Sequence, residues 1–534
     1  MKMTVSQAMV ECLKAENVKV VFGYPGAAIC PFYDALLDAE NDIRQVLVRQ
    51  EANGGHAANG YARISGKPAV CIATSGPGAT NLITAIATAY ADSIPIVCIT
   101  GQVNTDQIGS DVFQEADITG SAEPFVKHSY LLKDPEDTAR VFKEAFYIAG
   151  TGRPGPVLID IPMDVQKAVI DFEYPEKCEI RSYKPTTKGN YVQVRRVMAA
   201  LEEAEKPLIC IGGNGRGFAV VAEQIRELAD LMQIPVITTM MGISVFPDDD
   251  QLFCGMIGTH GVKMANAAVN ECDVLFLVGA RVGDRAVKTP LALEKTTIIH
   301  IDIDPAEIGK NIGADLPLVG DAKLVLQQMT ELAKPMKHDE WIAHIKTLGG
   351  ERKYVEPAKG TVNPRVFIDR LAKKMPANVT VVADVGQNQI WTCTEGRLLT
   401  SGGMGTMGYS VPAAIGAKMA DNSRATVAIC GDGAFQMSFM ELATAVQFGV
   451  DIKVVVMTNN RLGMVRELQT NGYHDRQTAV LDGSPDFIKL AEAYGIPAMR
   501  VYDDATMEKG VEMLAEHKGI CLVEVVVDKD MPTL

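Results

Sequence analysis

The chain has 534 residues, of which 47% are hydrophobic and 22% are charged, so it can bury large cores and is not composed like a disordered protein. This length exceeds one core, and roughly three domains of about 150–180 residues each are expected. The formal net charge of −15 argues against general binding to nucleic acid or to anionic membranes. A phosphate-bearing ligand would therefore need local help from backbone amides or a metal.

The first residues do not have the pattern of a secretory signal, because Glu11, Lys14 and Glu16 interrupt any apolar stretch. No apolar run approaches the ~18 residues that a membrane span requires. The eleven cysteines are scattered and form no CxxC pair, which favours free thiols in a reducing compartment. We therefore expect a cytoplasmic protein.

The first third of the chain, from Val18 to about Val165, alternates short β-branched runs, Gly/Pro turns and helical segments. KVVFGYPG leads into AAICPFYDALLDA, and AVCIATSGPGATN leads into LITAIATAYA and IPIVCITGQ. This alternation predicts a parallel sheet with crossover helices.

Two polar stretches that contain proline, residues 181–190 and residues 351–364, are typical of linkers. Between them lie PLICIGGNGRG, VLFLVGARVGDR and TTIIHIDIDPAEIG, and after them VTVVADVGQ, ATVAICGDG, IKVVVMTNN and GICLVEVVVD. The sequence thus predicts an α/β protein of three doubly wound parallel-sheet domains, at residues 1–170, 190–335 and 364–534.

One motif in the third segment points to chemistry. In VAICGDG a strand runs into a glycine turn, and AFQMSFMELATAVQFG is predicted to follow as a helix. Asp432 lies between Gly431 and Gly433, and Asn459 and Asn460 end the next predicted strand. Mg²⁺ prefers such oxygen ligands and usually binds together with phosphates. Each residue alone is most simply a turn or strand end, but the pair predicts a metal–phosphate site at the carboxyl edge of a sheet.

GDG followed by an Asn-containing strand end resembles the signature of thiamin diphosphate (ThDP) enzymes. The likeness extends over nearly the whole chain to the catalytic subunits of acetohydroxyacid (acetolactate) synthases. It is carried by FGYPGAAICPFYDAL, QEANGGHAANGYAR, ATSGPGATNLITAIATAYADSIPIVCITGQV, DVFQEADI, GRPGPVLIDIPMDVQ, HIDIDPAEIGKN, GGMGTMGYSVPAAIGAK and NNRLGMVRELQ.

The resemblance implies a set of cofactor residues in the third domain. Metal ligands would be Asp432, Asn459 and the backbone carbonyl of Arg461, with Thr458 where the family has its first Asn. ThDP contacts would come from Gln387, Asn388, Gly405, Met407, Gly431, Gly433, Ala434 and Met464. Asn388 stands where the family usually has His.

Glu51 would be the catalytic acid that contacts the aminopyrimidine ring of ThDP, although a glutamate that opens a helix is also a favourable dipole contact. Residues near the substrate would be Ala27, Phe113, Gln114, Lys127 and Leu468. Ala27 replaces a usual Gly, Gln50 and Ala52 flank Glu51 where His and Gln are common, and Leu468 replaces a Trp used against the second substrate. Lys127 could equally be a solvated surface charge.

The middle domain resembles the FAD-binding domain of the same family. The GGNGRG stretch is weak as a GxGxxG motif, because it lacks the third glycine at the right offset. The implied FAD residues are Gly258, His260, Gly261, Arg281, Asp302 and Asp321. Thr259 stands where Met is more common, and Val282 and Gly283 where an aromatic residue and an Asp are more common.

The resemblance implies a transferase that decarboxylates pyruvate and joins the acetaldehyde unit to a second 2-oxo acid, which gives 2-acetolactate. It also implies Mg²⁺, branched-chain amino acid biosynthesis, a homodimer or dimer of dimers with the active site at the interface, and a possible regulatory small subunit. Two alternatives stay open: another ThDP-dependent decarboxylase or carboligase, and a non-catalytic flavin- or nucleotide-binding protein. The second has no need of Glu51.

Overall fold

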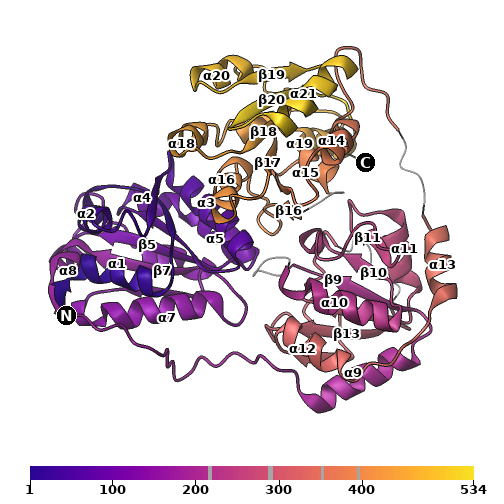
Figure 1. The fold of residues 1–534 in the computed structure, drawn as a ribbon, viewed down its shortest axis with the longest axis horizontal. Helices are drawn as coiled ribbons and strands as arrows, with labels where there is room; N and C mark the ends of the chain where they lie inside the picture. Colours follow the sequence, from indigo (N-terminus) through magenta and orange to yellow (C-terminus); the bar gives the residue numbers. More distant parts are fainter. Residues whose placement is uncertain (214–218, 287–292, 350–353, 394–396, 534) are drawn as a thin grey trace. The chain divides into compact units, whose positions relative to one another are not determined.

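The computed structural model describes residues 1–213, 219–286, 293–349, 354–393 and 397–533. Three six-stranded parallel sheets and one two-stranded antiparallel sheet make up its β-structure (Figure 1). The first and third sheets belong to one compact unit and the middle sheet to another. These three sheets confirm the predicted α/β class with three parallel-sheet domains. Among the described residues, no helix combines the length and the apolar character needed to cross a bilayer.

The first sheet has the strand order β3-β2-β4-β5-β7-β6, so its chain reverses direction across the sheet between β2 and β4. Its strands are β2 (Val20–Tyr24), β3 (Arg44–Leu47), β4 (Ala69–Ala73), β5 (Ile96–Gln102), β6 (His128–Leu131) and β7 (Val157–Pro162). The helices of this domain are α1 (Val5–Ala15), α2 (Cys30–Leu37), α3 (Glu51–Ser65), α4 (Pro77–Asn81), α5 (Ile83–Ala91), α6 (Ile118–Ala122), α7 (Thr138–Gly150) and α8 (Met163–Lys167).

The two ends of this domain pair with each other. Strand β1 (Lys2–Thr4) runs antiparallel to β8 (Val169–Asp171), and the Met1 amino group donates to the Phe172 carbonyl at 3.1 Å. No helix or strand lies between β8 and α9, which agrees with the linker predicted over residues 181–190.

The middle sheet has the order β11-β10-β9-β12-β13-β14. Its strands are β9 (Pro207–Ile211), β10 (Val236–Thr238), β11 (Phe253–Met256), β12 (Val274–Val278), β13 (Thr297–Asp302) and β14 (Leu316–Val319). Its helices are α9 (Tyr191–Glu203), α10 (Ala219–Met232), α11 (Lys263–Glu271), α12 (Ala322–Thr330) and α13 (Asp339–Thr347). Counted in chain order this is 3-2-1-4-5-6, the order of dinucleotide-binding folds.

The middle unit extends beyond the expected boundary at residue 335, to Tyr354. Helix α13 belongs to it because its apolar side docks on the sheet: Ile345 is fully buried, and the Trp341 indole donates to the Pro207 carbonyl at 3.0 Å.

The third sheet, drawn in orange to yellow in Figure 1, has the order β16-β15-β17-β18-β20-β19, which matches that of the first sheet when each is counted in chain order. Its strands are β15 (Thr380–Ala383), β16 (Arg397–Leu399), β17 (Thr426–Gly431), β18 (Lys453–Thr458), β19 (Ala498–Val501) and β20 (Cys521–Val526). Its helices are α14 (Pro364–Lys374), α15 (Gln387–Thr392), α16 (Ser410–Ala420), α17 (Asp432–Phe435), α18 (Glu441–Phe448), α19 (Gly463–Gly472), α20 (Phe487–Ala493) and α21 (Asp504–Glu516).

The single helix predicted after the GDG motif is wrong, because the structure divides it into α17 and α18. Between them the backbone bonds Met437 N to Ala434 O and Ser438 N to Phe435 O span three residues instead of four. This tighter winding separates the two helices, and it continues into the first turn of α18, where Glu441 N bonds to Ser438 O and Leu442 N to Phe439 O.

The first and third domains pack through α3 and α16. A β-carbon added at Gly60 would lie 2.0 Å from the Ala413 carbonyl oxygen, and one at Gly416 would lie 1.8 Å from that of Ala57. Both positions therefore require glycine, since any side chain would force the two helices apart.

Candidate active site

Glu51 is the first residue of α3, in the first domain. The side-chain oxygen of Gln50 caps this helix by accepting from the Asn53 backbone N–H at 3.1 Å. One carboxylate oxygen of Glu51 accepts a hydrogen bond from the Asn81 side chain at 2.9 Å. The other lies near Gly78, where an added β-carbon would be 3.3 Å away. Glu51 thus faces the segment that follows β4.

Three loops at the carboxyl edge of the first sheet meet beside Glu51. They follow β2, β4 and β5, and they lie at the point where the strand order reverses, which is where ligands bind in such folds. A β-carbon on Gly26 would lie 2.5 Å from Thr74, and one on Gly76 would lie 2.8 Å from the Gln114 carbonyl oxygen. The Thr74 hydroxyl is buried and has no hydrogen-bond partner among the described residues, as expected of a group awaiting a ligand.

The structure gathers three of the predicted substrate residues at this edge. Ala27 follows Gly26, and Phe113 precedes Gln114 with 86% of its surface exposed. Lys127 lies elsewhere, because it precedes β6 and so stands at the amino edge of the same parallel sheet. Its ammonium group donates to the carbonyls of Ile148 and Thr151, at the end of α7, where a cation suits the helix dipole. The structure therefore does not bring Lys127 to the other substrate residues.

The second group of site residues lies at the reversal point of the third sheet. Asp432 follows β17 and is 1% exposed. Its carboxylate accepts from the backbone N–H groups of Gly433 at 2.9 Å, Asn459 at 3.2 Å and Asn460 at 2.6 Å. Burial raises the pKa of Asp432 to about 6, although these N–H groups oppose the rise. A bound cation would instead hold this carboxylate ionised.

The proposed metal donors are close together and suit a hard cation. Asp432 bonds to the backbone of Asn459, and the Asn459 side-chain oxygen accepts from the Arg461 N–H at 3.1 Å. The Thr458 hydroxyl beside them is buried without a hydrogen-bond partner in the described part of the chain. One carboxylate, one amide oxygen and one backbone carbonyl leave room for phosphate oxygens, which is how Mg²⁺ usually binds.

The residues predicted to contact the diphosphate line the same edge. Gln387 begins α15, directly after Gly386, whose φ of 130° is accessible to glycine alone. The Asn388 side chain donates to the carbonyls of Asp384 and Ile429 at 2.8 and 3.2 Å, so its amide joins the ends of β15 and β17. A β-carbon on Gly433 would lie 2.5 Å from the Leu462 side chain, which keeps this turn free of any larger residue. Ala434 follows it as a buried residue of α17.

Sequence reasoning missed the residue that holds the Met407 loop. Asp384 is fully buried and accepts from the backbone N–H groups of Gly408 at 3.0 Å and Ser410 at 2.8 Å. Gly405, with φ of 63°, begins the turn, and the Met407 methyl group would lie 3.6 Å from a β-carbon on Gly433. The loop therefore places Met407 against the turn at Gly433.

Helix α19 carries the two remaining residues of the site. Met464 lies in its first turn, partly buried, and Leu468 lies one turn later with 60% of its surface exposed. Leu468 is thus available to a ligand and does not belong to the core.

Glu441 is a further residue that sequence reasoning missed, and it connects the two domains around Glu51. Its fully buried carboxylate accepts from the Arg49 backbone N–H at 2.9 Å and from the Asn53 side chain at 3.1 Å. These two residues flank Glu51 in the chain, so α18 of the third domain fixes the start of α3.

The proposed flavin residues follow the strands of the middle sheet. Gly258 comes after β11, Arg281 after β12, Asp302 ends β13 and Asp321 comes after β14. All stand at the carboxyl edge of a sheet with dinucleotide-binding strand order, so the arrangement fits FAD. A β-carbon on Gly212, at the end of β9, would lie 1.9 Å from the Gly279 carbonyl oxygen. Residues 214–217 of the GGNGRG stretch lie outside the described residues.

Several of these groups also have local partners. Asp321 caps α12 by accepting from the Lys323 N–H at 3.0 Å, and one Asp302 oxygen accepts from the Asp304 N–H at 2.9 Å. A β-carbon added at Gly258 would lie 2.3 Å from the Arg285 carbonyl oxygen. The Gly258 carbonyl accepts a hydrogen bond from the Asn266 side chain. His260 and Gly261 complete this turn, in which the Gly261 N–H donates to the Gly258 carbonyl at 2.9 Å.

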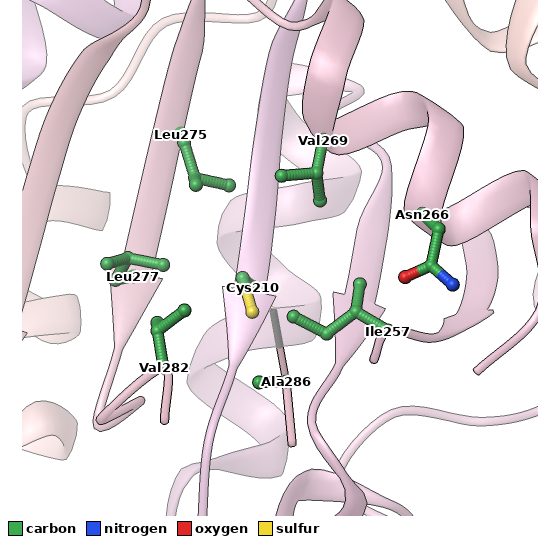
Figure 2. Close-up of a pocket in the computed structure, with 8 residues that line it drawn as sticks. All are labelled: Cys210, Ile257, Asn266, Val269, Leu275, Leu277, Val282 and Ala286. Atoms are coloured by element: carbon green, nitrogen blue, oxygen red, sulfur yellow. The ribbon is translucent and has the colours of Figure 1, made fainter. Parts of the chain in front are cut away.

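A small cavity of about 20 Å³ lies beneath this edge of the middle sheet (Figure 2). Apolar side chains and the Asn266 amide line it, and Cys210 points into it from β9. Val282, on its wall, has a φ of 45°, which a β-branched residue rarely adopts. The cavity can hold one water molecule but no flavin ring, so any flavin would bind outside it.

Comparison with known proteins agrees with this geometry. Residues 3–121 match the N-terminal TPP binding domain of thiamine pyrophosphate enzymes, residues 194–329 match the central domain, and residues 384–525 match the C-terminal TPP binding domain.

Relatives that align with nearly the whole chain belong to the same family. The chain is 44% identical to the probable acetolactate synthase large subunit of Methanocaldococcus jannaschii, over 98% of this chain and 92% of that one. It is 43% identical to an acetolactate synthase large subunit of Mycobacterium tuberculosis, over 99% and 88%, and 42% identical to the acetolactate synthase of Arthrospira platensis, over 99% and 95%. The chain therefore belongs to the thiamine pyrophosphate enzyme family, among the acetolactate synthase large subunits.

Proposed function

We propose that this protein is an acetolactate synthase, which decarboxylates pyruvate and transfers the acetaldehyde unit to a second 2-oxo acid. The observation that carries the proposal is that this chain keeps Glu51 at the carboxyl edge of the first sheet, and Asp432 bonded to Asn459 at the carboxyl edge of the third. Incubation of the protein with pyruvate, ThDP and Mg²⁺ tests it. Acetolactate is the expected product.

Another ThDP-dependent activity would give a different product from the same incubation. A simple 2-oxo-acid decarboxylase would release free acetaldehyde from pyruvate alone. The relatives named as acetolactate synthases or their large subunits favour transfer to a second 2-oxo acid.

The third domain would hold the cofactor. Gln387, Gly433 and Ala434 would contact the diphosphate, Met407 and Met464 the rings, and Asp432, Asn459 and the Arg461 carbonyl the Mg²⁺. When bound, ThDP supplies the electron sink for decarboxylation and for formation of the new carbon–carbon bond. Glu51 would share a proton with a ring nitrogen of the aminopyrimidine, while Asn81 fixes the direction of its carboxylate.

We expect pyruvate to compete well with 2-oxobutanoate as acceptor, so that acetolactate is the main product from an equimolar mixture. Leucine at position 468 has no flat face to place against the extra methyl group of 2-oxobutanoate. Leu468→Trp should raise the ratio of acetohydroxybutyrate to acetolactate about tenfold or more, since one methylene in an apolar pocket is worth roughly 10–200-fold. The ratio of the two products measures this.

Thr470→Trp is the matched control for Leu468→Trp. It lies on the same helix, two residues further, and so faces another direction. It should leave the product ratio unchanged. A wild-type enzyme that already strongly prefers 2-oxobutanoate would contradict the role of Leu468.

We expect the purified protein to carry FAD, bound at the carboxyl edge of the middle sheet. Arg281→Ala should lower flavin affinity about tenfold or more, because a hydrogen bond to a charged group contributes about 1.5–3 kcal/mol. Flavin absorbance of the purified protein, and its retention on dialysis, measure both effects. Arg226→Ala, on the exposed side of α10, is the control and should keep the flavin. An absent flavin spectrum, with no binding of added FAD, would refute the assignment.

The domain boundaries at residues 1–170, 190–335 and 364–534 belong to the same proposal, with α13 added to the middle domain. A homodimer or dimer of dimers would bring Glu51 of one chain to the cofactor on another. The relatives named as large subunits support a regulatory small subunit as partner. A role in branched-chain amino acid biosynthesis and a cytoplasmic location belong to the proposal as what the family resemblance implies.

A further inference from the structure

Glu467 is not among the residues predicted to hold the cofactor or the metal. It nevertheless belongs to the hydrogen-bond network around the proposed metal site. It belongs to α19, between Met464 and Leu468, and its side chain is 20% exposed. Its carboxylate accepts from the Gln387 side chain at 3.1 Å. It also accepts from both the backbone N–H of Thr533, at 2.6 Å, and the Thr533 hydroxyl.

The Gln387 amide can take only one orientation here. Its nitrogen faces the Glu467 carboxylate and the Met531 carbonyl, at 3.1 and 2.9 Å, and neither of these groups can donate. The amide nitrogen must therefore point to them, and the amide oxygen must point the other way. That oxygen lies 3.3 Å from the Asn459 side-chain nitrogen and accepts from it.

This bond in turn fixes the direction of the Asn459 amide. With its nitrogen held by Gln387, its oxygen is turned toward residue 461, where it accepts from the Arg461 N–H at 3.1 Å. An amide can coordinate a cation only through its oxygen. The Gln387 oxygen and the Arg461 N–H thus act together to keep the Asn459 oxygen, and not its NH₂ group, turned toward residue 461 and the proposed cation.

The chain segment 528–533, here called the C-terminal segment, holds the other side of this network. Met531 and Thr533 are 4% and 2% exposed. Trp391 donates to the Pro532 carbonyl at 3.2 Å, and Arg466 lies 3.4 Å from Asp530. A β-carbon on Gly463 would lie 1.9 Å from the Gln387 oxygen, so only glycine lets α19 approach so closely.

We propose that Glu467 is a positioning residue for the metal site, which acts through Gln387 to turn the side-chain oxygen of Asn459 toward the cation. The inference rests on the proposed function, because it takes Asn459 as a metal ligand. Residues that orient metal ligands are typically worth about 10–100-fold in metal affinity.

The test is the affinity of the full-length protein for Mn²⁺ in the presence of ThDP, followed by the loss of the free Mn²⁺ electron paramagnetic resonance signal. Glu467→Ala should weaken binding by about 10–100-fold. Glu467→Gln keeps an acceptor oxygen toward Gln387 and should stay within about threefold of wild type. Thr470→Val, on the same helix but bonded to Asp475 outside this network, should also stay within about threefold.

A second background separates orientation from a general loosening of α19. Asn459→Asp presents an oxygen in either orientation, so Glu467→Ala should there change Mn²⁺ affinity by no more than about twofold. An equal loss in both backgrounds, or a wild-type affinity in Glu467→Ala, would overturn the inference. Failure of the wild type to bind Mn²⁺ with ThDP would instead overturn the proposed function.

Discussion

Glu51→Gln is expected to lower turnover by about 10²–10⁴-fold, the usual value of a positioned acid–base group. Glutamine keeps the size of the side chain and can still accept from Asn81, which lies 2.9 Å from the carboxylate. It cannot exchange a proton with the aminopyrimidine ring. Turnover and the rate of hydrogen–deuterium exchange at the thiazolium C2 of bound ThDP should therefore fall together, while ThDP and Mg²⁺ affinities stay near those of the wild type.

The expected loss of rate is too large to arise from a weakened helix α3. Loss of a negative charge in the first turn of α3 costs about 0.3–1 kcal/mol of stability. A 10²-fold loss of rate corresponds to about 2.7 kcal/mol of barrier. Glu11→Gln, an exchange of the same kind on the surface of α1, should leave turnover unchanged. A fall of less than tenfold for Glu51→Gln would show that Glu51 is not the activating acid.

Residues at strand ends could be located from the sequence because strands were recognisable one at a time. VAICGDG and IKVVVMTNN predict two neighbouring parallel strands, and their carboxyl ends do bring Asp432 to Asn459. Local composition suffices for this, since β-branched runs and glycine turns mark each strand and parallel pairing then fixes which ends meet.

Contacts between distant loops could not be predicted in the same way. Asn81 beside Glu51 and Glu441 beside Asn53 depend on how helices pack across the sheets, and no periodicity in the sequence records that packing. Lys127 shows the reverse case. The family resemblance suggested a place at the substrate, but a parallel sheet separates the two ends of each strand, and Lys127 stands at the amino edge.

Asp432→Ala is expected to abolish activity through loss of the metal and of ThDP. Without this carboxylate the protein would no longer hold the Mg²⁺ that balances the charge of the diphosphate. The same carboxylate also holds the backbone N–H groups of Gly433, Asn459 and Asn460. Excess Mg²⁺ and ThDP should restore activity in part at most. Calorimetric titration with ThDP and Mg²⁺ checks this, and wild-type affinity would show that Asp432 is not a metal ligand.

A mixture of the Asp432→Ala protein with the Glu51→Gln protein also tests whether each active site is shared between two chains. In a symmetric dimer with shared sites, a mixed dimer of the two variants has one site with both defects and one site with neither. Refolding or coexpressing the two inactive proteins in equal amounts should then recover about a quarter of wild-type activity, since half of the dimers are mixed and each has one intact site of two. Sites formed within one chain would leave every site defective, and the mixture would stay inactive. Recovery therefore requires that Glu51 serve the cofactor bound by another chain, and its absence would place the acid and the metal in the same chain.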